Sequence, residues 1–317
     1  MILVLGGTGL VGGAVLRRLV ELDQPVRTLV RRPAPGLSAP GVEVVVGDVG
    51  DAVSLRSAVQ GVRQVFLVMA NGPEQQQHER AVASAAAAGG VEHLVKVSAP
   101  YVGPTLPVAI ARMHHAIEQE ILEIASRSGM QHTFLRPYAF MQNLLNIAPT
   151  VRMAGYFTGT TGATPMNMVD VRDIADVAAV ALTTARTRGR ALVLTGSRTV
   201  SYPQIAEHLT ALGRPTRYLD MQPAEFAAGL QRSGLPTWVV DHLLEIQAMT
   251  RASPELPTAA VQDVTGRAPL TVEAFLSENL TEFARPRGLR ERLTAVPLRH
   301  AGRRHLRTVA PPLTPTP

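Results

Sequence analysis

The 317-residue chain contains no cysteine, which excludes disulfides, a thiolate nucleophile and a thiolate metal site. Lysine is almost as scarce, because Lys96 is the only one and the other 30 basic residues are arginines. No stretch of roughly 18 residues is both apolar and free of charge, and Met1 leads into a strand-like run without a signal sequence. We therefore expect a cytoplasmic protein without a membrane span or a metal centre.

Aromatic residues make up only 4% of the chain, and none lies in the basic C-terminal segment, residues 285–317. This segment holds eight arginines and one glutamate, so it carries +7 where the whole chain carries +6, and residues 1–284 are left with −1. Nucleic-acid binding segments usually pair basic residues with aromatic side chains that stack on bases. We expect a disordered, Pro-rich tail that the folded protein can lose, and no nucleic-acid partner.

The start of the chain has the strongest local pattern. An apolar run, Ile2–Leu5, is followed by five glycines and a threonine within residues 6–13, and apolar residues then recur with helical spacing. Two glycine spacings fit this strand–turn–helix context, G-x-G-x-x-G from Gly7 and G-x-x-G-x-x-G from Gly6. Such a turn lets a pyrophosphate approach the backbone amides at a helix N-terminus. The pattern predicts a dinucleotide-binding site.

The second predicted strand, residues 25–32, ends in Arg31 and Arg32, and the nearest acid, Asp23, precedes the strand. An NAD site usually has an acid at this strand end, which accepts hydrogen bonds from the ribose hydroxyls. A guanidinium instead pairs with the 2′-phosphate of NADP, which a carboxylate would repel. The alternative interpretation is a solvated arginine pair at a strand end. The sequence favours NADP(H) over NAD(H).

Strand and helix patterns alternate through the first half of the chain. The predicted strands are 42–49, 64–69, 92–99 and 131–137, and the predicted helices are 53–61, 74–90 and 108–129. Beyond them we expect helices within 168–185, 202–213, 223–233 and 236–249, and a strand at 191–196. In the first of these helices, Asp170, Arg172 and Asp173 are expected to cap the helix and form an ion pair.

This alternation predicts an α/β fold, a doubly wound Rossmann parallel sheet with a smaller, mostly helical C-terminal substrate lobe. The expected division is an NADP(H)-binding Rossmann domain over residues 1–150, whose sheet later segments complete, and a substrate lobe over 151–284 that roofs the cleft. The tail, 285–317, follows.

Six motifs together resemble one family. They are GGTGLVGGAVLRRL, RTLVRRP, VVGDVGD, HLVKVSA, RSGMQHTFLRPYAFMQN and DVRDIADVAAVAL, and they resemble the NmrA-like branch of the atypical short-chain dehydrogenases/reductases over roughly residues 1–283. That branch includes NADPH-dependent quinone reductases, azoreductases, isoflavone-reductase relatives, tailoring enzymes of aromatic polyketide pathways and redox-sensing regulators.

The resemblance implies which residues would contact the cofactor and the substrate. For the pyrophosphate these are Gly6, Thr8, Gly9, Leu10, Val11 and Gly12. Arg31, with Arg32 beside it, would meet the 2′-phosphate, Asp48 and Val49 the adenine edge, Met69 and Ala70 the adenosine ribose, and Ser98 and Pro137 the nicotinamide. The substrate pocket would be lined by Tyr138, Phe140, Met141 and Asn143.

The chain departs from the wider superfamily in its proton-transfer residues. Standard members use Tyr-x-x-x-Lys, in which the lysine lowers the pKa of a tyrosine that protonates the carbonyl oxygen. No tyrosine here has a lysine four residues later, and Lys96 lies inside a predicted strand, where we expect it to reach the sheet edge or a carboxylate. Tyr101, His114 and His115 remain as weak catalytic candidates.

Three functions are consistent with this sequence. The first is an NADPH-dependent oxidoreductase acting on a small apolar conjugated or aromatic acceptor such as a quinone, which needs little acid catalysis. The second is an NADP(H)-sensing regulatory protein that performs no chemistry, and the third is a tailoring enzyme that oxidises or oxygenates an aromatic polyketide. Fold alone does not separate these functions. A monomer or a homodimer is expected.

Overall fold

The computed structural model describes residues 1–253 and 255–284, so the predicted tail lies outside the described residues. Seven parallel strands form the main sheet in the order β10-β6-β5-β4-β1-β2-β3. Their bounds are β1 Ile2–Leu5, β2 Val26–Val30, β3 Val42–Val46, β4 Gln64–Leu67, β5 His93–Val97, β6 Gln131–Pro137 and β10 Arg190–Leu194. The strand order reverses between β1 and β4, and ligands bind at the carboxyl edge of such a switch point.

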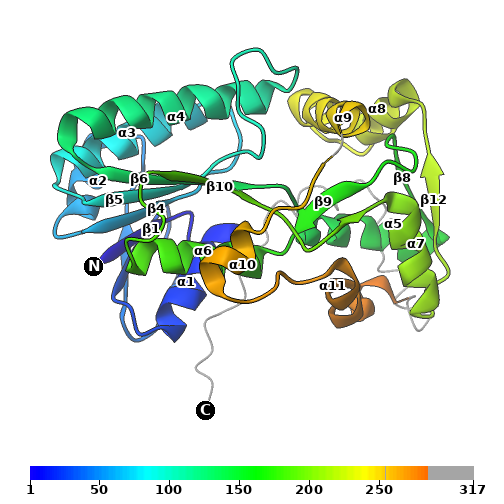
Figure 1. Cartoon of the computed structure of the whole chain (residues 1–317), viewed down its shortest axis with the longest axis horizontal. Helices are drawn as coiled ribbons and strands as arrows, with labels where there is room; N and C mark the ends of the chain where they lie inside the picture. Colours follow the sequence, from blue (N-terminus) through cyan, green and yellow to red (C-terminus); the bar gives the residue numbers. More distant parts are fainter. Residues whose placement is uncertain (254, 285–317) are drawn as a thin grey trace.

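Helices cover both faces of this sheet (Figure 1). On one face lie α2 Ala52–Val59, α3 Gln75–Ala88 and α4 Ala109–Ser128, and on the other α1 Leu10–Glu21, α6 Val171–Thr183 and α10 Ala260–Thr265. Because side chains alternate along a strand, Ile2 and Val4 of β1 pack in the cluster with α1 and α6, whereas Leu3 and Leu5 pack in the cluster with α2 and α3. Burial on both faces explains the continuous apolar run in β1.

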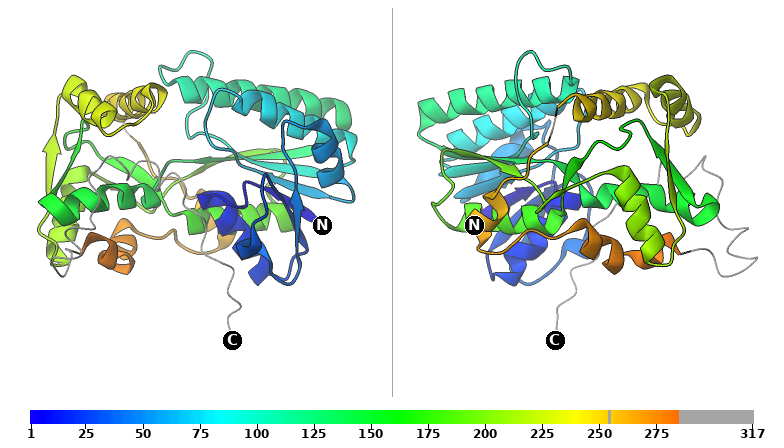
Figure 2. Two further views of the ribbon diagram at one scale, coloured as in Figure 1. Left: turned by 180° about the vertical axis from the view of Figure 1, so that it is seen from behind. Right: turned by 45° about the vertical axis from the view of Figure 1, so that its right-hand side comes forward.

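A smaller lobe stands at the carboxyl edge of the main sheet. Its helices are α5 Ala148–Ala154, α7 Tyr202–Ala211, α8 Pro223–Arg232, α9 Thr237–Ala252 and α11 Val272–Glu278. It also contains the 3-10 turns Met141–Ile147 and Leu280–Phe283. A third 3-10 turn, Pro35–Leu37, belongs to the main body. A separate apolar cluster, which includes Met141, Phe157, Leu209 and Phe275, forms its core. Figure 2 shows α9 beside the N-terminal end of α4, where the amide of Ala109 donates to Glu245 Oε2 at 2.9 Å.

The fold class is confirmed, with local differences. Strand β6 has the predicted bounds, but the helix expected within 168–185 starts later, because Met166–Val169 forms strand β9 and the carboxylate of Asp170 caps α6 by accepting from the amide of Arg172. The smaller lobe also holds two small sheets that the sequence analysis missed. One contains β7 Ala139–Phe140, β9 and β11 Thr199–Val200, and the other pairs β8 Tyr156–Gly159 with β12 Arg217–Asp220.

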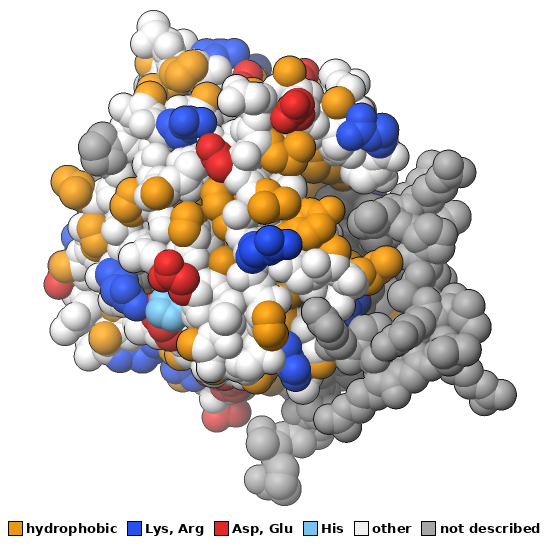
Figure 3. Space-filling model, turned by 90° about the vertical axis from the view of Figure 1, so that its right-hand side faces the viewer, with side chains coloured by type: hydrophobic (Ala, Val, Ile, Leu, Met, Phe, Trp, Pro, Cys, Tyr) orange, Lys and Arg blue, Asp and Glu red, His pale blue; other side chains and the backbone are white. Residues whose placement is uncertain are grey.

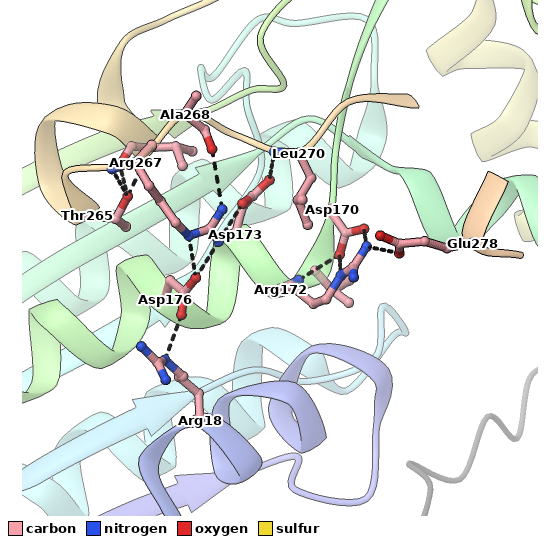
Figure 4. A network of polar contacts seen from close by, with 12 residues as sticks. Arg18, Asp170, Arg172, Asp173, Asp176, Thr265, Arg267, Ala268, Leu270 and Glu278 are labelled. Atoms are coloured by element: carbon pink, nitrogen blue, oxygen red, sulfur yellow. Dashed lines mark hydrogen bonds and ion pairs between the residues drawn. The ribbon is translucent and has the colours of Figure 1, made fainter. Parts of the chain in front are cut away.

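Ion pairs tie the closing segment of the chain to the main body (Figure 4). The guanidinium of Arg267, which follows α10, contacts the carboxylates of Asp173 and Asp176 on α6, and Arg18 Nε of α1 lies 2.7 Å from Asp176 Oδ1. Arg172 Nη2 lies 2.8 Å from both Asp170 Oδ2 and Glu278 Oε2. The expected helix cap by Asp170 and its ion pair with Arg172 are therefore confirmed, and Asp173 pairs with Arg267. None of the described helices is long and apolar enough to cross a membrane.

Candidate cofactor and active site

The glycine turn between β1 and α1 has space for backbone but not for side chains. Gly6 has φ +82°, and a Cβ on it would lie 2.5 Å from the carbonyl oxygen of Val68. A Cβ on Gly12 would lie 2.2 Å from the carbonyl oxygen of Gly6, to which the amide of Gly9 donates at 2.8 Å. The glycines therefore allow the turn to fold tightly against the start of the helix.

The N-terminus of α1 is open to an anion. Gly9 is its N-cap residue, makes no side-chain cap, and no acid occupies the first turn. Thr8 is exposed and Leu10 is partly exposed, whereas Val11 and Gly12 are buried against the sheet. Free amides and the positive end of the helix dipole favour a phosphate at this position. The turn thus fits the pyrophosphate of a dinucleotide.

The ends of β2 and β3 lie beside this turn in the sheet. Arg31 and Arg32 follow β2 directly, and both side chains are exposed. Asp48 and Val49 follow β3, and Asp48 Oδ1 accepts from the amide of Gly50 at 2.7 Å. Two guanidinium groups without a carboxylate at the end of β2 fit a 2′-phosphate, and the neighbouring strand end would border the adenine.

On the other side of the switch point, the residues after β4, β5 and β6 continue the same edge. Met69 is partly buried against the core, Ala70 is exposed, and Pro137 ends β6 as a buried residue. Ser98 is only 7% exposed, and its amide donates to the carbonyl of Leu135 at 2.7 Å. Among the described residues its Oγ has no hydrogen-bond partner. This buried hydroxyl is free to meet a bound ligand at the carboxyl edge of β5.

Tyr101 and Tyr138 meet in the segments that follow β5 and β6. Tyr138 follows β6 and is buried, and its hydroxyl donates to Tyr101 Oη at 2.6 Å, while the two rings pack edge to face at 5.4 Å. Burial raises the pKa of both hydroxyls, although the hydrogen bond from Tyr138 lowers the pKa of Tyr101 in part. Both residues are candidates from the sequence, but their hydroxyl contact joins positions 37 residues apart and has no local sequence signal.

Lys96 belongs to a buried network of polar side chains inside the main body. Its ammonium lies 2.8 Å from Glu79 Oε2, 2.9 Å from the carbonyl of Val97 and 3.0 Å from His114 Nδ1, and neither Lys96 nor Glu79 is exposed at all. Gln75 donates to Glu79 Oε1 at 2.7 Å. The expectation that Lys96 meets a carboxylate is confirmed.

The contact with Lys96 determines the protonation state of His114. Lysine only donates, so Nδ1 of His114 accepts and the proton of the neutral ring sits on Nε2. Burial, with the charge of Lys96 as a further cause, holds the pKa of His114 well below its usual range. His114 is therefore a neutral, buried imidazole, whereas His115, the next residue of α4, is partly exposed.

Glu79 lies in the predicted helix 74–90 and has no role in the sequence-based prediction of the site. A signal was present, because Gln75 and Glu79 lie on the same face of α3 as the buried Val82, Ala83 and Ala86. Polar side chains at helical spacing with buried apolar ones indicate a buried partner of opposite charge.

The segment that follows β6, residues 138–143, connects the main body to the smaller lobe, and we call it the wall of the site. Phe140 is partly buried against the main core, Met141 is buried in the core of the smaller lobe, and Asn143 is exposed. Gln142 Nε2 donates to the buried Asp170 Oδ1 at 3.0 Å, and Gln142 Oε1 accepts from the amide of Val171 at 3.2 Å. These contacts hold the wall against the start of α6.

Glu255 is a second buried acid that the sequence analysis did not identify. It follows α9, is 8% exposed, and accepts from the amide of Asn167 and from Thr250 Oγ1. Burial raises the pKa of Glu255. Its charge contributes to raising the pKa of Tyr101 and Tyr138, after burial as the main cause.

The outer face of the smaller lobe has an open hollow of about 540 Å³ between α7 and β12, lined by Ala206, Thr210 and Tyr218 among others. Figure 3 looks onto this side and shows apolar side chains interspersed with arginines and acids. The hollow is not part of the carboxyl edge of the main sheet. Across residues 1–253 and 255–284, no group of three or more histidine or acidic side chains is arranged to hold a metal ion.

Comparison with known proteins agrees with this geometry. The chain matches the NmrA-like family over residues 1–279. It is 35% identical over 289 residues to the NAD(P)H azoreductase of Xenophilus azovorans, covering 89% of this chain and 99% of that protein. It is 37% identical over 287 residues to the (4-alkanoyl-5-oxo-2,5-dihydrofuran-3-yl)methyl phosphate reductase of Streptomyces griseus, covering 90% and 99%.

A solved structure has the same fold along nearly the whole chain. The NADPH-dependent quinone oxidoreductase of Escherichia coli, in complex with NADPH, superposes with a TM-score of 0.79 at 27% identity and covers 88% of this chain and 100% of its own. The family match over residues 1–279 and the two relatives above 30% identity together show that this chain belongs to the NmrA-like family.

Proposed function

We propose that this protein is an NADPH-dependent oxidoreductase that transfers hydride to a small, apolar, conjugated acceptor such as a quinone. The observation that carries the proposal is the glycine turn of β1 and α1, where side chains are excluded and an uncapped helix N-terminus faces the switch point of the sheet. Membership in the NmrA-like family, whose compared relatives include an NAD(P)H azoreductase and an NADPH-dependent quinone oxidoreductase, supports the same proposal.

The preference for NADPH over NADH rests on the end of β2. The exposed Arg31 and Arg32 would pair with a 2′-phosphate, and no acid at the end of β2 would accept from a free ribose hydroxyl. Asp48, Val49, Met69 and Ala70 would border the adenosine, and Ser98 and Pro137 would border the nicotinamide.

The class of acceptor rests on the names of the relatives and on the wall of the site. An azo dye, a quinone and a dihydrofuranone all present a double bond conjugated with further unsaturated groups, so charge that arrives with the hydride delocalises. Phe140, with Tyr138 and Met141 beside it, would supply an apolar surface for such a planar molecule, and Asn143 would lie at its rim.

The test follows oxidation of NADPH and of NADH by their absorbance, with a panel of small quinones and conjugated lactones. We expect turnover with NADPH and weaker turnover with NADH. Binding of NADPH without turnover by any acceptor would instead support the sensor, and oxygen consumption with an aromatic polyketide would support the tailoring enzyme.

A pair of alanine variants tests the cofactor site itself. Gly12→Ala places a Cβ against the backbone of Gly6 and should abolish NADPH binding measured by the fluorescence of the cofactor. Gly36→Ala is the matched control, because a Cβ on Gly36 meets no atom within 4 Å. Equal NADPH affinity of both variants would contradict the proposed site.

A further inference from the structure

The tyrosine pair has a defined direction of hydrogen bonding. Tyr138 Oη donates its proton to Tyr101 Oη at 2.6 Å, so the proton of Tyr101 points elsewhere. Among the described residues, no other hydrogen bond uses Tyr101 Oη, and its side chain is partly exposed whereas Tyr138 is buried. The hydroxyl proton of Tyr101 is thus available for donation to a ligand, whereas that of Tyr138 is already used in its hydrogen bond to Tyr101.

The position of the pair suits a reaction at the carboxyl edge of the sheet. β5 and β6 are neighbours, and the pair joins the segments that directly follow them. The amide of Tyr138 donates to the carbonyl of Leu194 at the end of β10, which fixes its backbone to the sheet. Ser98, whose buried hydroxyl has no partner among the described residues, lies in the same segment after β5.

We propose that Tyr101 is the residue that protonates the reduced acceptor, and that Tyr138 is a positioning residue that stabilises the tyrosinate left behind. This inference rests on the proposed function and extends it to a proton donor. It assigns to a second tyrosine the part that a lysine plays in the Tyr-x-x-x-Lys arrangement.

Bound NADPH would supply a hydride with its electron pair. As the acceptor takes up this pair, its oxygen becomes negatively charged, the O–H bond of Tyr101 breaks, and a new O–H bond forms on the acceptor. The negative charge then rests on Tyr101 Oη, where the hydroxyl of Tyr138 donates to it, until a proton from water restores the phenol.

Hydrogen bonding explains why a neutral hydroxyl can serve here. A bond to a charged oxygen is roughly twice as strong as one between neutral groups, so the contact from Tyr138 strengthens when Tyr101 loses its proton. Burial keeps Tyr138 protonated by raising its pKa.

Two acceptors with different proton demand test the proposal. A quinone needs a hydride and a proton, whereas a cationic triarylmethane dye needs only a hydride and becomes a neutral product. Tyr101→Phe should lower kcat for the quinone at least tenfold and change dye decolorisation by less than about twofold. Tyr138→Phe should give a smaller loss with the quinone alone.

Tyr156→Phe is the matched control, since it removes a hydroxyl from β8 in the smaller lobe and should leave both reactions unchanged. Equal losses with both acceptors in Tyr101→Phe, or no loss with either, would overturn the assignment of Tyr101. Failure of the wild type to oxidise NADPH with any acceptor would instead overturn the proposed function.

A measurement on the protein without cofactor tests the pair directly. The chain has five tyrosines, so the ¹³Cζ resonances of labelled tyrosine can be assigned by single phenylalanine variants and titrated. Because the bond from Tyr138 lowers the pKa of Tyr101, Tyr138→Phe should raise the pH at which the Tyr101 signal titrates. An unchanged titration of Tyr101 in this variant would refute the role of Tyr138, whatever the activity.

Discussion

Removal of the Lys96 ammonium should be among the most destabilising single changes in the main body. Lys96→Met leaves the carboxylate of Glu79 fully buried, with only the hydrogen bond from Gln75 to compensate its charge. Breaking a buried ion pair by removing one partner costs about 3–5 kcal/mol. A change of 1 kcal/mol shifts the Tm of a domain of roughly this size by about 2–4 °C, so we expect a loss of roughly 6–20 °C.

The companion variant tests the electrostatic reason for this loss. Glu79→Gln in the Lys96→Met background removes the orphaned charge and keeps an amide oxygen to accept from Gln75, so it should recover at least half of the lost Tm. Arg127→Met is the control, since Arg127 and Glu123 form an exposed ion pair, with 76% and 60% of their side chains exposed. Such pairs contribute about 0–1 kcal/mol, so its Tm should change by at most a few degrees.

Calorimetry or thermal circular dichroism supplies the Tm values, and initial rates taken well below them separate stability from catalysis. The buried position of Lys96 predicts a loss of turnover under about tenfold, which is roughly 1.4 kcal/mol of barrier. A Lys96→Met protein that melts like the wild type, or a double variant no more stable than the single one, would refute the reasoning.

Three further predictions concern the site. The double variant Arg31→Asp with Arg32→Ala should reverse the cofactor preference, and its NADPH affinity in equilibrium binding should fall about 5- to 150-fold. Equal affinity of the wild type for NADPH and NADH would contradict the pairing of these arginines with the 2′-phosphate. Phe140→Ala should lower kcat/KM for a quinone more than about tenfold at unchanged NADPH affinity, because Phe140 would align the acceptor with the hydride donor. His115→Ala should lower kcat/KM for the same quinone less than about tenfold. Because burial raises the pKa of Glu255, the wild type should lose stability as the pH rises through the interval above the ordinary glutamate pKa of about 4.3. Glu255→Gln removes this titration, so its Tm should rise relative to that of the wild type as the pH increases above the ordinary glutamate pKa, and a constant difference in Tm would contradict the raised pKa.

Local sequence patterns determined the frame of the candidate cofactor site. The apolar run of β1, the glycines and the helical spacing of α1 follow one another within 21 residues, and each has a conformational reason that needs no distant partner. The same holds for the position of Arg31 and Arg32 after β2. The alternation of strand and helix then predicted the parallel sheet, because crossover connections leave few other arrangements.

The smaller lobe was less predictable for a physical reason. Its strands are two to four residues long, and their pairing joins segments as distant as Tyr156–Gly159 and Arg217–Asp220. A strand of that length has no measurable periodicity, so only the partner that accepts its backbone hydrogen bonds decides that it is a strand.

Tertiary structure alone decided which polar side chains meet. Tyr101 and Tyr138 stand 37 residues apart, and their hydroxyl contact depends on β5 and β6 being neighbours. Lys96, Glu79 and His114 come from a strand and two helices, and Glu255, after α9, accepts from the amide of Asn167 in β9. The sequence showed which of these groups can carry a charge or a proton; their burial and mutual distances, which control pKa and hydrogen-bond direction, exist only in the folded chain.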